Sequence, residues 1–154
     1  MSNIMKRRLF IILIVLTIIF IWGQSLMSPK QSGEESEAVK SFLEKMFVFE
    51  NALTDFILKN VRKIAHFVEF GALGLEMVLF TFICTVFSRR DKIYLSFFGP
   101  VVAVIDETIQ KFTLRGSSFV DVLIDSAGYF TFVLITALVF LIIKNKNKGN
   151  IKDV

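Results

Sequence analysis

The chain has 154 residues, of which 54% are hydrophobic and 18 are phenylalanine, and its mean hydropathy is +0.64. This composition is too apolar for an ordinary soluble domain, and the apolar residues come in blocks, as in membrane proteins. The formal net charge of +4 does not indicate nucleic-acid binding, because the basic residues flank the apolar blocks. A single cysteine, Cys84, excludes an intramolecular disulfide.

Four apolar blocks predict four membrane-spanning helices. A helix needs about 20 apolar residues to cross the hydrocarbon layer, where it satisfies its own backbone hydrogen bonds. We therefore predict an all-α fold, an integral membrane four-helix bundle that forms a single domain over residues 1–154. The basic residues before the first block would also fit a signal peptide, but the remaining blocks would still span the membrane. The predicted spans are residues 9–27, 66–87, 93–109 and 121–143.

The segment between the first two spans is predicted to hold one more helix. Residues 29–37 are typical of a polar loop, whereas residues 38–60 place apolar and charged residues at helical spacing. A helix with this pattern lies on a membrane surface. We therefore predict an amphipathic interfacial helix at about residues 38–60 on the outer side, where it could also cover a site formed by the spans.

The distribution of basic residues predicts the orientation. Four spans place both termini on one side of the membrane, together with the short loop that carries Arg89, Arg90 and Lys92. Lysine and arginine accumulate in cytoplasmic loops. Both termini are therefore predicted to be cytoplasmic, and residues 110–121 are predicted to lie on the outer face.

Each of the last three spans carries polar residues on one face near its outer end. At 100° per residue, His66 and Glu69 share a face of the second span. A charged side chain in the middle of a membrane costs at least about 2.5 kcal/mol, so such groups should face one another or a wet cavity. We therefore predict one shared site. It contains His66, Glu69, Asp106, Glu107, Gln110, Asp121 and Asp125.

This cluster has a structural alternative, because buried ionisable groups can form a network that only holds a bundle together. Asp121 and Asp125 lie four residues apart and repel each other unless a cation or a proton intervenes. A neighbouring arginine or lysine could supply that cation, and so could a metal ion. One imidazole with carboxylates suits a hard ion. The presence of a metal stays open, and no other cofactor is expected.

Three segments, in this order, resemble the VanZ-like family: RKIAHFVEFGALG at 62–74, DETIQKF at 106–112 and DVLIDSAG at 121–128. These are small bacterial membrane proteins whose namesake is linked to teicoplanin resistance. The resemblance implies a bacterial cytoplasmic (inner) membrane. It adds Lys63 and Arg115 to the binding residues, although the turn reads Leu114-Arg115-Gly116 where the family has Pro-Gly-Arg.

Three functions are compatible with these residues. A binding protein would hold a membrane lipid, a lipid-linked cell-wall precursor or a lipoglycopeptide at the outer leaflet, linked to glycopeptide (teicoplanin) resistance. A hydrolase or transferase acting on a lipid-linked substrate would use His66 and Glu69 with the acid–base pair Asp106 and Glu107. A transporter has only the mid-membrane Glu76 as specific support. Known nucleophile, zinc-protease and phosphate-loop motifs are absent from the sequence, which favours binding over catalysis.

Overall fold

The computed structural model describes residues 2–46, 52–84, 89–116 and 118–149. Within these ranges the chain forms helices joined by short connections, and no strand occurs there. The predicted all-α class is therefore confirmed for the described residues. The helices are α1 (Asn3–Ser25), α2 (Pro29–Met46), α3 (Ala52–Lys59), α4 (Val61–Cys84), α5 (Arg89–Phe112) and α6 (Phe119–Gly149).

Three helical segments of the described chain are long and apolar enough to cross a membrane: Val61–Ile83, Ile93–Phe112 and Phe119–Ile143. Helices α1 and α2 pass the same test together as a pair bent by 110°. The structure thus supports three spans, or four if the bent pair provides one.

Several helices extend beyond the predicted spans. Helix α4 begins at Val61 instead of residue 66, and α5 ends at Phe112 instead of residue 109. The charged residues at these ends continue the helix, because the apolar pattern marks contact with lipid and not the limit of the helical backbone. The predicted end of the second span, residue 87, lies outside the described residues.

The predicted polar loop at residues 29–37 is wrong, because this segment forms the first half of α2. Its start is a capping box: Ser28 Oγ accepts a hydrogen bond from Gln31 N (3.3 Å), and Gln31 Oε1 accepts one from Ser28 N (3.1 Å). Pro29 stands at the first helical position, where its fixed φ favours a helix. Of the predicted helix at about residues 38–60, the first part lies in α2 and the last part in α3, and residues 47–51 lie outside the described residues.

Helices α4 and α6 cross at very short distance because a glycine of each helix faces the backbone of the other helix. A Cβ atom on Gly128 would lie 2.2 Å from the carbonyl oxygen of Phe67, and one on Gly74 would lie 2.4 Å from that of Tyr129. Small residues commonly permit such crossings between membrane helices. The fully buried ring of Tyr129 also covers Gly99 on α5. This contact fixes α4, α5 and α6 relative to one another.

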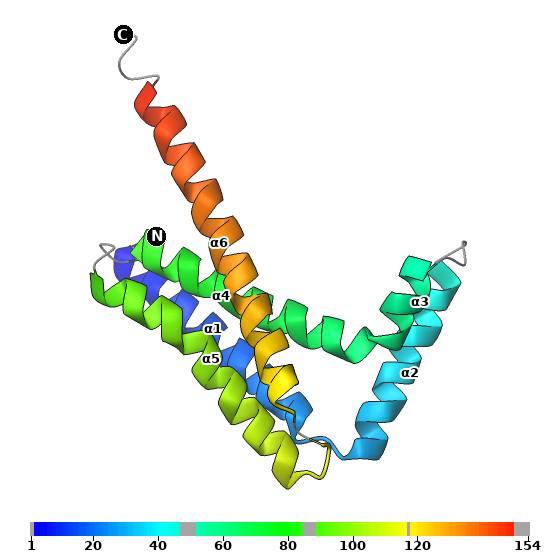
Figure 1. Cartoon of the computed structure of the whole chain (residues 1–154). Helices are drawn as coiled ribbons and strands as arrows, with labels where there is room; N and C mark the ends of the chain where they lie inside the picture. The colour runs from blue at the N-terminus through cyan, green and yellow to red at the C-terminus, as the bar shows by residue number, and fades with distance from the viewer. Residues whose placement is uncertain (1, 47–51, 85–88, 117, 150–154) are drawn as a thin grey trace.

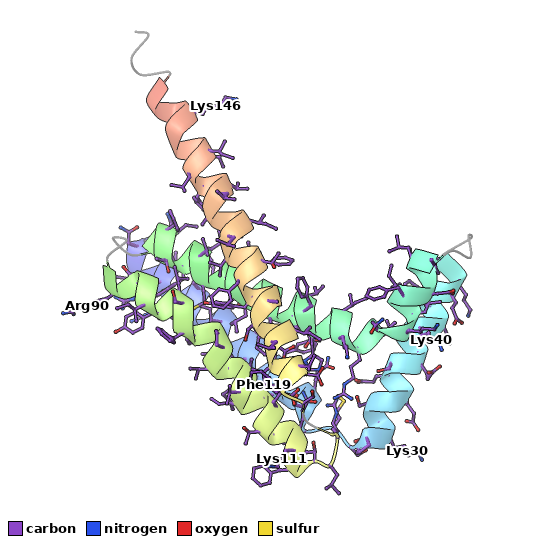
Figure 2. All side chains as sticks on the ribbon, viewed as in Figure 1. Lys30, Lys40, Arg90, Lys111, Phe119 and Lys146 are labelled. Carbon is purple, nitrogen blue, oxygen red and sulfur yellow. The ribbon has the colours of Figure 1, made fainter. Side chains whose placement is uncertain are left out.

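The bundle has two distinct ends (Figure 1). The N-terminal ends of α1 and α5 lie beside the C-terminal end of α4, and α6 runs back beyond them. The opposite end holds the C-terminal end of α1 and the turn from α5 to α6, and α2 and α3 lean away from the bundle there. Apolar side chains project outward along the C-terminal half of α6 (Figure 2), where Leu134, Leu138 and Ile142 are exposed. Such a surface suits contact with lipid.

Candidate functional site

A hydrogen-bonded chain joins three helices at the end of the bundle that holds the α5–α6 turn. Asp106 on α5 is fully buried and accepts two hydrogen bonds. Ser25 Oγ of α1 donates to Oδ1 at 2.7 Å, and Gln110 Nε2 donates to Oδ2 at 2.8 Å. Arg62 of α4 donates to Gln110 Oε1 at 2.7 Å. Asp106 is therefore held firmly from both sides.

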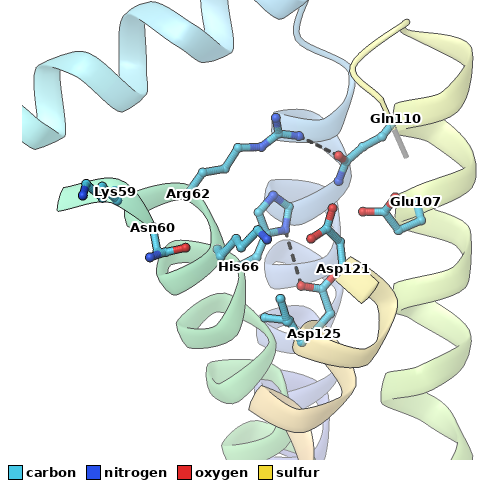
Figure 3. Close-up of a pocket in the computed structure, with 10 residues that line it drawn as sticks. Lys59, Asn60, Arg62, His66, Glu107, Gln110, Asp121 and Asp125 are labelled. Carbon is cyan, nitrogen blue, oxygen red and sulfur yellow. Dashed lines mark hydrogen bonds and ion pairs between the residues drawn. The ribbon is translucent and has the colours of Figure 1, made fainter. Parts of the chain in front are cut away.

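His66 on α4 lies within 4 Å of both Asp106 and Asp125 of α6, but beyond hydrogen-bond distance of either. Figure 3 shows His66 beside Asp125. The His66 Nδ1 atom is 3.8 Å from Asp125 Oδ1 and 3.9 Å from Asp106 Oδ2. Asp125 is 1% exposed, and neither of its carboxylate oxygens has a hydrogen-bond partner among the described residues. The same holds for His66 Nδ1. Since buried polar groups nearly always have partners, these orphaned atoms need an explanation.

A cavity of about 170 Å³ opens above this cluster. His66 and Asp125 reach into it, and Arg62 extends across it toward Gln110 (Figure 3). A neighbouring apolar groove shares Asn60, Lys63 and Ile124 with the cavity. It is otherwise lined by Phe56, Ile64 and Phe67. The cavity is lined by Lys59, Asn60, Arg62, Lys63, His66, Glu107, Gln110, Asp121, Ile124 and Asp125.

A second cavity, of about 410 Å³, lies on the other side of Arg62 and His66, which line both. It contains Glu69 and Arg115. Arg115 donates to Gln24 O of α1 and, at 2.6 Å, to Ser32 Oγ of α2. It therefore joins the α5–α6 turn to the end of α1 and the start of α2. Partial burial lowers the pKa of Arg115 from its ordinary value, and the neighbouring Arg62 adds to this effect.

The predicted single site is thus divided into two cavities. Glu69 and Arg115 line the second cavity, and the other predicted residues meet in or under the first. Asp106 lies behind His66 and Asp125. The predicted residues that line the first cavity are Lys63, His66, Glu107, Gln110, Asp121 and Asp125.

Glu107 and Ser118 define the turn between α5 and α6. The backbone N–H of Ser118 donates to Glu107 Oε2 at 2.9 Å. The Ser118 hydroxyl accepts from Val120 N at 3.1 Å, at the start of α6. Ser118 therefore caps this helix, which gives its hydroxyl a structural role.

Ser25, Lys59 and Asn60 belong to the site but are not predicted from the sequence. Ser25 is the last residue of α1, and its importance depends on the packing of α1 against α5. Its signal in the sequence is the polar pair Gln24-Ser25 near the C-terminal end of the first predicted span. Lys59 and Asn60 precede α4 in the segment predicted to be interfacial.

Glu76 lies apart from both cavities, in the middle of α4. Its Oε1 atom accepts a hydrogen bond from Thr17 Oγ1 of α1 at 2.8 Å. This contact joins two helices inside the bundle. A structural role therefore accounts for one oxygen of this carboxyl group.

The sequence profile of the VanZ/LLP1 family matches residues 10–142, which cover most of the chain. Searches of the curated proteins and of the solved structures found no match. The matched range runs from α1 to α6 and includes every residue of both cavities. The chain therefore belongs to the VanZ/LLP1 family.

Proposed function

We propose that this protein is a component of the bacterial cell envelope that binds the polar headgroup of a lipid-linked molecule at the outer leaflet of the cytoplasmic membrane. The main support for this proposal is that the polar cavity adjoins an apolar groove. Asn60, Lys63 and Ile124 line both spaces. A headgroup in the cavity could therefore remain attached to an acyl or prenyl chain in the groove.

Basic residues around the cavity favour an anionic headgroup. Lys59, Arg62 and Lys63 all line it. Arginine binds phosphate through paired N–H groups, and lysine binds it as a compact charge. Lipid-linked cell-wall precursors carry phosphate groups, so they are the preferred ligand class. A lipoglycopeptide such as teicoplanin, which has an acyl chain, would use the same groove, and this would connect the site to resistance.

Catalysis on such a ligand is the alternative function. His66 and two carboxylates at the cavity floor could in principle transfer protons. No observation in the described residues identifies a nucleophile beside them. Binding is therefore the function that we propose.

Replacing Lys63 by glutamine should weaken the binding of undecaprenyl phosphate about fivefold, because a lysine near an anionic group contributes roughly 1 kcal/mol. Native mass spectrometry of the purified full chain, with this lipid added in steps, measures the change. Lys111→Gln is the matched control, since Lys111 is exposed at the same end of the bundle but does not line the cavity. Equal weakening by both substitutions would mean that charge alone, and not the cavity, attracts the lipid.

The proposed orientation makes the α5–α6 turn accessible from outside the cell. In a Cys84→Ala background, Leu114→Cys should react with a membrane-impermeant maleimide in intact cells, because Leu114 is 85% exposed in this turn. Asn3→Cys, at the exposed start of α1, should react only after the cells are permeabilised. The opposite pattern would place the cavity on the cytoplasmic side and rule out an outer-leaflet ligand.

A further inference from the structure

We propose that His66, Asp106 and Asp125 bind one divalent transition-metal ion, such as Mn²⁺, at the floor of the first cavity. The three side chains come from α4, α5 and α6 and each offers one ligand atom. These atoms all lie within 4.8 Å of one another. The metal site itself stands on this geometry, whereas its use in headgroup binding rests on the proposed function.

The unpartnered atoms of the cluster point to a cation. Asp125 is 1% exposed, and both of its oxygens lack a hydrogen-bond donor among the described residues. His66 Nδ1 is also without a partner and lies between the two carboxylates. A buried carboxylate without a partner is strongly unfavourable. An ion in this position would supply the missing partner to all three groups.

The distances are compatible with coordination after a small side-chain movement. A metal–ligand bond of about 2.1 Å places neighbouring ligand atoms roughly 3.0–3.5 Å apart. The His66 Nδ1 atom is 3.8 Å from Asp125 Oδ1 and 3.9 Å from Asp106 Oδ2. These two pairs must therefore approach by less than about 1 Å, and the Asp106–Asp125 pair, whose ligand atoms lie within 4.8 Å, must approach by less than about 2 Å. Rotations of the His66 and Asp125 side chains can provide these movements.

Asp106 already has the surroundings of a metal ligand. Ser25 donates to one of its oxygens and Gln110 donates to the other, which fixes the plane of the carboxylate. Such outer contacts orient ligands in known metal sites and raise metal affinity about 10–100-fold. Arg62 holds Gln110 in turn. This arrangement leaves Asp106 firmly oriented and leaves Asp125 free to close on an ion.

The ligand types indicate the class of ion. Carboxylate oxygens suit Mg²⁺, Ca²⁺ and Mn²⁺, whereas imidazole suits transition metals. One imidazole with two carboxylates combines these preferences, and Mn²⁺ satisfies both.

An ion here would also change what the cavity attracts. The cavity lining contains three basic residues, Lys59, Arg62 and Lys63, and three acidic ones, Glu107, Asp121 and Asp125. Asp106 adds a fourth carboxyl group behind them. A divalent ion coordinated by His66 and Asp125 would face the cavity and add two positive charges, which favours a phosphate oxygen as a further ligand.

Titration of the purified, metal-free full chain with Mn²⁺, followed by electron paramagnetic resonance of the free ion, tests the site without any lipid. Wild type should bind about one ion per chain, and Asp125→Asn should bind at least tenfold more weakly. Glu76→Gln removes a buried carboxyl group from the same helix as His66 and should bind like wild type. Wild type without saturable binding, or Asp125→Asn with wild-type affinity, would overturn the proposal.

A variant with a changed metal preference shows whether residue 125 binds the ion or only supports folding. In a Cys84→Ala background, Asp125→Cys should bind Cd²⁺ more tightly than the background chain and Mn²⁺ less tightly, because a thiolate prefers softer ions. Unchanged preference would contradict coordination by residue 125. Repeating the undecaprenyl phosphate titration with and without Mn²⁺ distinguishes the two proposals. If the affinity for the lipid is the same with and without Mn²⁺, the proposed function remains valid and the ion has no part in lipid binding.

Discussion

Gly128→Ala is expected to lower the free energy of unfolding by about 3 kcal/mol, the upper range for overpacking of a tight contact. The added Cβ would lie 2.2 Å from the carbonyl oxygen of Phe67, and a backbone atom of α4 cannot rotate out of the way. The two helices must therefore separate at their crossing. Unfolding of the purified protein in detergent, followed by circular dichroism, measures the change.

Gly23→Ala provides the control for this substitution. Gly23 also lies inside an apolar helix, but no heavy atom would come within 4 Å of its added Cβ. Alanine has the higher helix propensity, so stability should stay equal or rise by up to about 1 kcal/mol. If both variants unfolded like wild type, the close crossing of α4 and α6 would be wrong. The crossing matters for the site because Gly128 lies one turn after Asp125 and sets its distance from His66.

Asp106→Leu is expected to lower the free energy of unfolding by about 3 kcal/mol as well. The substitution removes the acceptor of the Ser25 hydroxyl and of the Gln110 amide, both of which are buried. Leaving a buried donor without a partner costs about 1–3 kcal/mol. Detergent unfolding of wild type and variant measures the loss.

Ser25→Ala together with Asp106→Leu tests the cause of that loss. Ser25→Ala removes the hydroxyl that donates to Asp106 and that also accepts from Gln110 Nε2 at 3.3 Å. Because each single variant already breaks the Ser25–Asp106 hydrogen bond, the double variant should be less unstable than the sum of the single variants. Strictly additive effects would mean that Ser25 and Asp106 are not coupled. The hydrogen bond between α1 and α5 would then contribute little.

Apolar blocks and helical spacing were sufficient to predict the main helices and the common end at which the polar residues meet. Both properties depend on local sequence. His66, Asp106 and Asp125 are predicted to share a site because each is polar on an apolar helix, where membrane burial allows few alternatives. The structure brings them within 4.8 Å of one another.

Features that depend on particular contacts could not be predicted in the same way. Helix α2 replaces the predicted loop because Ser28 and Gln31 form a reciprocal cap, a signal outweighed by the polar composition of the segment. Glu69 shares a helix face with His66, but His66 lines both cavities whereas Glu69 lines only the second. The second cavity is formed where α4 faces α1 and α2, and the sequence does not show which helices meet this part of α4. Helical periodicity specifies a face but not the neighbours that it meets.

Substitution of Asp106 and substitution of Asp125 should change the free energy of unfolding in opposite directions. This contrast tests the central claim that the cluster is a binding site. Asp106 is fully hydrogen-bonded, whereas neither oxygen of Asp125 has a partner among the described residues. Binding residues commonly lower stability in the absence of ligand, and replacing them raises it. Replacing a residue that only holds the bundle together lowers the free energy of unfolding instead.

The most direct measurement is therefore the free energy of unfolding of Asp125→Asn and wild type, both free of metal and added lipid, with Mn²⁺ and undecaprenyl phosphate binding measured on the same samples. A binding site predicts a variant at least as stable as wild type, because a buried carboxyl group without a hydrogen-bond partner is replaced by a neutral amide. It also predicts weaker binding of the ion or the lipid. A variant that is less stable by about 2 kcal/mol or more, with binding unchanged, would contradict the account and identify the cluster as a structural network.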